Sequence, residues 1–165
     1  MTDSEPTEAS QPTTADGTAI VHYAAPPVVG GVEAVIEAHV RTFVQARHPI
    51  TVIAGQGNDD ALARGAGFLH LPKISSRHPE IARATEQLEK GHVPGNFEEL
   101  VAELLAVLSP SLGRFDNVIV HNILTKRFNL PLTAALFTLL DEGAIRNCIA
   151  WCHDIGWTSD HSRPN

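Results

Sequence analysis

The chain has little cysteine, and its two cysteines lie close together in the sequence. Cys148 and Cys152 are the only ones among 165 residues. Four residues of an extended strand rise about 13 Å, which is too far for the Cα atoms of a disulfide. We therefore expect free, buried thiols, as is usual in a reducing compartment.

Long apolar runs are also absent. The longest nearly apolar stretch, residues 130–140, contains a proline and two threonines. It is shorter than the roughly 20 residues that a bilayer requires. Residues 1–18 have neither a basic start nor an apolar segment, so they do not resemble a signal peptide. We expect no transmembrane segment and a cytoplasmic protein.

Basic residues are few and scattered. The net charge is −7, and residues 1–18 contain acidic residues but no lysine or arginine. Those acidic residues are Asp3, Glu5, Glu8 and Asp16. With its serine, threonine and proline, this segment is predicted to be a disordered tail. A nucleic-acid-binding protein usually has a basic face, so we expect no nucleic-acid partner.

Several common catalytic motifs are missing. The chain has no Gly-x-Ser-x-Gly elbow and no Gly-Lys-Ser/Thr phosphate loop, which argues against a serine hydrolase and a P-loop enzyme. The Gly30-Gly31 pair lacks the third glycine of the dinucleotide fingerprint, because Ala34 and Val35 stand there. A nicotinamide-dependent oxidoreductase is therefore disfavoured.

Strand-like and helix-like segments alternate along residues 19–157, which predicts one domain. Strands are expected at 19–23, 50–54, 67–71, 117–120 and 148–152. Helices are expected at 31–46, at 79–90, after an N-cap at Asn96, and at 130–141. This alternation is typical of an α/β fold, a Rossmann-like doubly wound parallel sheet, and we expect the strand order 3-2-1-4-5.

Polar residues follow the predicted strands where each one ends. They are Gly30-Gly31, the loop 55–60, His121-Asn122 and His153-Asp154. The carboxyl ends of parallel strands meet at one edge of the sheet, where ligands bind in such folds. Gly30-Gly31 also opens a helix, whose free N–H groups suit an anion or a sugar hydroxyl. We expect a binding site at this edge.

Each of these features also has a purely structural interpretation. Gly30-Gly31 would serve equally as a tight turn, and Glu33 would stabilise the first helical turn. His121 would cap a strand. Trp151 and Trp157 would either shape a pocket and stack on a sugar ring or pack in the core.

Nine histidines raise the question of a metal site. Cys148, Cys152, His153 and His161 are the set nearest to a zinc-binding arrangement. Their spacing matches no compact zinc motif, and neighbouring residues of a strand point to opposite faces. We expect no metal.

Four motifs, in order, resemble a known family. They are His22-Tyr23-x-x-Pro26-Pro27-x-x-Gly30-Gly31-Val32-Glu33, Ile50–Gly55, the strand ending in His121-Asn122, and Ile149–Asp154. Over residues 19–157 the chain resembles the N-terminal domain of the retaining family-four glycosyltransferases of the GT-B fold. In that family, two Rossmann-like domains face each other across a cleft.

The resemblance implies roles for particular residues. The N-terminal domain binds a sugar or lipid-linked acceptor, and the other domain binds most of the nucleotide-sugar donor. Gly30 and Gly31 would approach the donor phosphates or the acceptor. His153 would contact the transferred sugar, which makes it the candidate catalytic residue. His121, Asn122 and Asp154 are further candidates for binding; no cofactor is implied beyond the nucleotide-sugar co-substrate.

One family feature is missing from this sequence. The family carries two glutamates eight positions apart in its second domain, and no glutamate pair here has that separation. We therefore expect half of an active site, inactive alone, with a separate C-terminal domain chain as partner. Residues 158–165 would be a tail or the start of a linker. The alternative is a non-catalytic module or truncated remnant that binds sugars or nucleotide diphosphates.

Overall fold

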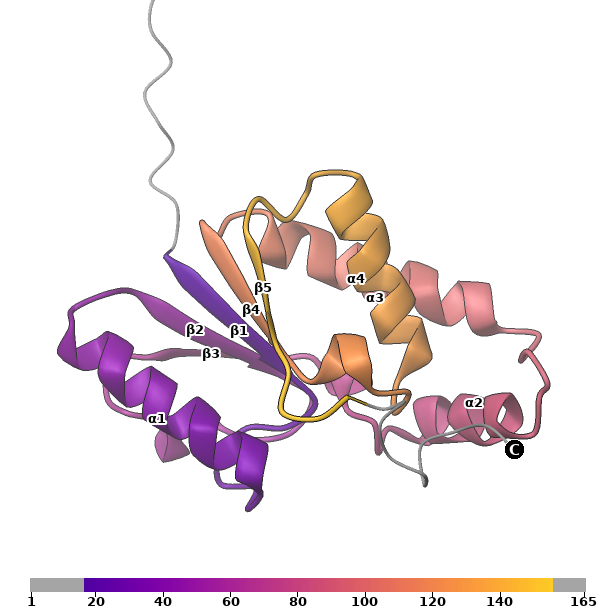
Figure 1. Ribbon diagram of the computed structural model, residues 1–165, viewed down its shortest axis with the longest axis horizontal. Coiled ribbons are helices and arrows are strands. Elements are labelled where there is room, and N and C mark those ends of the chain that lie inside the picture. The colour runs from indigo at the N-terminus through magenta and orange to yellow at the C-terminus, as the bar shows by residue number, and fades with distance from the viewer. Residues whose placement is uncertain (1–16, 156–165) are drawn as a thin grey trace, which may run out of the picture.

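Five parallel strands form the centre of the computed structural model, which describes residues 17–155 (Figure 1). The strands are β1 (Thr18–His22), β2 (Ile50–Ala54), β3 (Gly67–His70), β4 (Asn117–His121) and β5 (Cys148–Trp151). Their order across the sheet is β3-β2-β1-β4-β5, as the sequence predicted. The Rossmann-like α/β fold is therefore confirmed.

Four α-helices connect these strands. They are α1 (Gly31–Gln45), α2 (Pro79–Glu89), α3 (Phe97–Leu112) and α4 (Leu130–Asp141). Gly91 and Gly143 follow α2 and α4 with positive φ angles, which glycine adopts without steric cost. Asn96 stands at the N-cap of α3, but its side chain makes no capping bond. Asn129 caps α4 by accepting a hydrogen bond from the Leu132 amide.

Helices cover both faces of the sheet, and each face has its own core. On one face, Ile36 and Val40 of α1 pack over Ile20 and Val52. On the other, α3 and α4 pack together over β1, β2 and β4 (Figure 1). Strands buried on both faces need a largely apolar, β-branched sequence, which explains runs such as Ile50–Ala54.

The strand register aligns side chains across β1, β4 and β5. Ile20 pairs with Ile119, and Ile119 pairs with Ile149. Side chains two residues further along a strand point to the same face. His22, His121 and Trp151 therefore form the next row, on the face that α1 covers.

Some sequence expectations need correction or lie outside the described residues. Thr18 is buried and begins β1, so the predicted tail cannot extend to residue 18. Residues 1–16 of that tail, Trp157, His161 and the segment 158–165 lie outside the described range. Both cysteines are free, but Cys152 is exposed, so the prediction of two buried thiols was wrong. No helix within residues 17–155 is long and apolar enough to cross a membrane.

Candidate binding site at the carboxyl edge of the sheet

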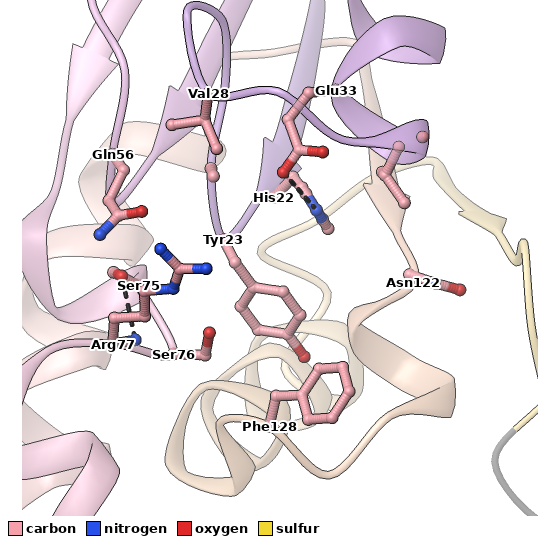
Figure 2. A pocket seen from close by; sticks show the side chains of 13 residues that line it. His22, Tyr23, Val28, Glu33, Gln56, Ser75, Ser76, Arg77, Asn122 and Phe128 are labelled. Carbon is pink, nitrogen blue, oxygen red and sulfur yellow. Dashed lines mark hydrogen bonds and ion pairs between the residues drawn. The ribbon is translucent and has the colours of Figure 1, made fainter.

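A cavity of about 240 Å³ opens at the carboxyl ends of the strands (Figure 2). Its walls come from segments far apart in the sequence. These are the end of β1 and the following loop, the first turn of α1, Gln56 after β2, the turn 75–77 before α2, Asn122 after β4, and Phe128. The predicted convergence of strand ends thus creates a pocket that is open to solvent on one side.

The N-terminus of α1 forms one wall of this cavity. Gly30 is the extended N-cap, and its carbonyl accepts the first helical bond, from Ala34, at 3.1 Å. Within residues 17–155, the amides of Gly31, Val32 and Glu33 have no hydrogen-bond acceptor. A Cβ added to Gly31 would meet no atom within 4 Å, so the backbone there is open to a ligand.

The loop after β2 is held in place by close backbone contacts. A Cβ on Gly55 would collide with the backbone of Ser75. Gly57 has a φ of +122° and lies against the backbone of Ala25. The Ala25 amide donates to the Gln56 carbonyl at 2.9 Å. These contacts fix Gln56 and the turn beginning at Ser75 against the end of β1.

His22, at the end of β1, has a fixed orientation. Its Nδ1 lies 2.9 Å from the backbone carbonyl oxygen of His121, and its Nε2 lies 3.9 Å from Glu33 Oε1. Burial lowers the pKa of His22, and this effect outweighs the opposing effects of the His121 carbonyl and of Glu33. The neutral ring therefore donates from Nδ1 and carries a lone pair on Nε2.

His121 is the centre of a cluster of aromatic rings. Its side chain is completely buried, and its ring centroid lies 5.3 Å from that of His39, 5.4 Å from His153 and 5.9 Å from Trp151. Burial, with smaller contributions from the neighbouring histidines, lowers the pKa of His121 to about 3. Its Nε2 is buried and has no hydrogen-bond partner within the described residues. His121 is therefore neutral near pH 7.

Asn122 ties the end of β4 to the residues after β5. Its Oδ1 accepts hydrogen bonds from the amides of His153 and Asp154 at 3.0 and 3.2 Å. Asp154 also contacts the Asn122 side-chain amide and Lys126, and these interactions lower the pKa of its carboxyl. His153 and Asp154 themselves are exposed.

The opposite wall of the cavity includes two groups with unused hydrogen-bonding capacity. The Tyr23 hydroxyl is buried without a hydrogen-bond partner in residues 17–155, and burial raises its pKa. Its ring packs edge to face against Phe128, with centroids 6.1 Å apart. Arg77 is exposed, and its guanidinium projects toward the cavity in Figure 2.

Two of the six predicted site residues line the cavity, and the other four lie around it. Gly31 and Asn122 line the cavity. Gly30 stands just outside it as the N-cap of α1, and His121 lies behind it, with its carbonyl bound to His22. His153 and Asp154 lie on the outer side, held through Asn122 and His121.

The sequence pattern did not single out several other residues that line this cavity. His22 could have been found, because it stands at the end of a strand as His121 does. The turn 75–77 and Phe128 carry no comparable sequence signal.

The part of the chain that the structure describes contains no group of three or more histidine, cysteine or acidic residues arranged to hold a metal ion.

Comparisons of the chain with models of protein families, with curated proteins and with solved structures find no match.

Proposed function

We propose that this Rossmann-like unit is the acceptor-side half of a retaining glycosyltransferase that uses a nucleotide-sugar donor. The observation that carries the proposal is the cavity at the carboxyl edge of the sheet, where the free amides at the start of α1 meet the ends of β1, β2 and β4. Such an edge is the usual ligand site of this architecture.

The chemistry of the cavity suits a sugar or a sugar phosphate. Free helix amides donate hydrogen bonds to phosphate or hydroxyl oxygens, and the positive end of the helix dipole favours an anion. Gly31 leaves room for close approach. Polar groups of Gln56, Ser76 and Asn122 also line the cavity and can bind hydroxyl groups.

His153 is the proposed contact to the transferred sugar. Its Nε2 lies 3.1 Å from His121 Nδ1, and its backbone amide is held by Asn122. These bonds orient the imidazole while leaving it exposed, so it can meet a donor bound by a second domain facing this edge. That second domain would supply the cations that stabilise the leaving diphosphate.

A binding function without transfer is the alternative. Among the residues that the structure describes, Glu33 is the acidic residue lining the cavity, and it lies beside His22. This described lining offers hydrogen-bonding groups for a ligand but no pair of carboxylates for acid–base catalysis.

A two-part experiment tests the proposal. First, nucleoside diphosphates, nucleotide sugars and simple sugars are titrated into ¹⁵N-labelled protein. We expect the amide resonances of Gly31, Val32 and Glu33 to shift. If none of these ligands shifts them at millimolar concentration, the proposal is overturned. Second, transfer of radiolabelled sugar is measured with and without a separately produced donor domain of the family. Transfer with retained anomeric configuration supports the enzyme, and binding without transfer in either case favours the alternative.

A further inference from the structure

We propose that the cavity selects a small ligand with a hydroxyl group and an anionic group, the hydroxyl donating to His22 Nε2 and the anion facing Arg77. The anion is a phosphate or a carboxylate. This inference rests on the proposed function, because it identifies the ligand as the sugar acceptor or as the charged end of a larger acceptor.

His22 supplies the first argument. A backbone carbonyl only accepts hydrogen bonds, so the 2.9 Å contact with the His121 carbonyl places a proton on Nδ1. The neutral ring then has an acceptor lone pair on Nε2. Glu33 cannot satisfy it, because an ionised carboxylate is also only an acceptor and lies 3.9 Å away.

The residue is only 5% exposed and lines the cavity, yet its Nε2 has no hydrogen-bond partner among residues 17–155. The ring is largely buried and fixed by its Nδ1 bond, and because His22 lines the cavity, a bound donor can reach its Nε2 there. A hydroxyl group of a ligand would satisfy it.

Arg77 supplies the second argument. Its guanidinium forms no ion pair within the described part of the chain, although its backbone amide is fixed by a 3.1 Å hydrogen bond to Ser75 Oγ. Ser75 is itself buried and packed against Gly55. A free guanidinium on an anchored turn can bind phosphate or carboxylate through two parallel N–H groups.

The two features lie on different sides of the cavity. In Figure 2, His22 and Glu33 stand together, whereas Arg77 approaches from the side of Gln56 and Ser76. The free amides of α1 lie in the same first turn as Glu33 and add a positive potential to the cavity. Glu33 sits beside His22, so the carboxylate repels an anion from that side and favours one orientation of the ligand.

Cavity size limits the class of ligand. The volume of about 240 Å³ is below the roughly 300–1,000 Å³ of sites for drug-sized molecules. A monosaccharide or polyol with one anionic group matches this volume better than a nucleotide does. The inferred ligand is therefore distinct from the nucleotide-sugar donor.

The test compares four probes on the intact chain by calorimetry. Glucose 6-phosphate and glucuronic acid carry both groups, glucose carries only hydroxyls, and inorganic phosphate carries only the anion. We expect the first two to bind at least tenfold more tightly than the last two. Equal binding of glucose would overturn the role of the anion, and equal binding of phosphate would overturn the role of the hydroxyl. If none of the four binds, the inference is wrong, even if nucleotide sugars still shift the α1 amides.

Variants assign the two contacts. Arg77→Ala should weaken binding of the charged sugars about tenfold or more, as expected for a charge-assisted hydrogen bond, and Arg77→Lys should recover part of the loss. Arg64→Ala, an exposed arginine outside the cavity, is the matched control and should bind normally. Equal effects at Arg77 and Arg64 would show attraction by net charge only.

His22 is buried, so its substitution can disturb folding. Histidine ¹⁵N spectra of the unmodified protein avoid that difficulty. We expect the Nε2 resonance of His22 to have the position of an unprotonated nitrogen and to move toward that of a hydrogen-bonded one when glucose 6-phosphate binds. A protonated Nε2 in the free protein, or no movement on saturation, would overturn the hydroxyl contact.

Discussion

His121 Nδ1 and His153 Nε2 lie 3.1 Å apart and join the end of β4 to the residues that follow β5. One partner is completely buried and the other is exposed. The contact therefore links an exposed imidazole to a neutral imidazole in the interior. With His22 and His39, these residues place four imidazoles at one edge of the sheet.

This cluster predicts a loss of stability in acid. His121 titrates near 6.5 when unfolded and at about 3 when folded, so the unfolded chain binds more protons between these values. The free energy of unfolding should fall as the pH drops from about 6.5 toward 3, by at most about 1.4 kcal/mol per pH unit from His121. His22 and His39, whose pKa values are also lowered, add to this in the same direction. Urea unfolding at a series of pH values measures the slope.

The matched substitutions are His121→Leu and His92→Gln. The first removes a buried imidazole and should flatten the slope, whereas the second changes an exposed histidine after α2 and should leave it unchanged. An unaltered slope in His121→Leu would contradict the assignment.

Asn122 should be sensitive to substitution for two separable reasons. Its φ of +58° is unfavourable for most side chains, and its Oδ1 binds the amides of His153 and Asp154. Asn122→Ala loses both features and should destabilise the protein by about 2–4 kcal/mol. Asn122→Gly tolerates the backbone angle and should be about 1–2 kcal/mol less damaging.

Hydrogen exchange distinguishes the two contributions. In both variants the amides of His153 and Asp154 should exchange faster, because both lose the side-chain oxygen. Unchanged protection in the glycine variant would show that Asn122 does not hold this segment.

Gly55 should tolerate no side chain. Its missing Cβ allows the backbone of Ser75 to pack against it, so Gly55→Ala forces two main chains apart. We expect a loss of about 3 kcal/mol or more, as for other overpacked sites. Gly95→Ala is the control, because a Cβ there would meet nothing within 4 Å. Thermal unfolding of both variants measures the difference; similar stabilities would rule out the close contact.

Much of this architecture follows directly from local sequence signals. Largely apolar, β-branched runs such as Ile50–Ala54 specify buried parallel strands, and Gly143 marks the end of α4. Because parallel strands end at one edge, the positions of Gly31 and Asn122 in the site could be predicted without knowing any contact.

Other parts of the site depend on packing between distant segments. Arg77 reaches the cavity because Ser75 packs against Gly55, twenty positions earlier in the chain. Nothing in the periodicity of residues 75–78 indicates this contact. His39 was missed because it lies on a helix whose apolar face dominated the pattern, although it contacts His121 and Trp151.

Gly31 allows ligand binding to be separated from folding. A Cβ at this position would meet no protein atom within 4 Å, yet Gly31 lines the cavity at the start of α1. Gly31→Ala should therefore keep or slightly raise the free energy of unfolding, since alanine favours a helix by about 0.5–1 kcal/mol over glycine. Its methyl group would stand between a ligand and the free amides, so binding of glucose 6-phosphate should weaken about tenfold. Calorimetry and urea unfolding on the same samples measure both effects, with Gly95→Ala expected to change neither. Unchanged binding in a stable Gly31→Ala protein would mean that no ligand approaches the start of α1.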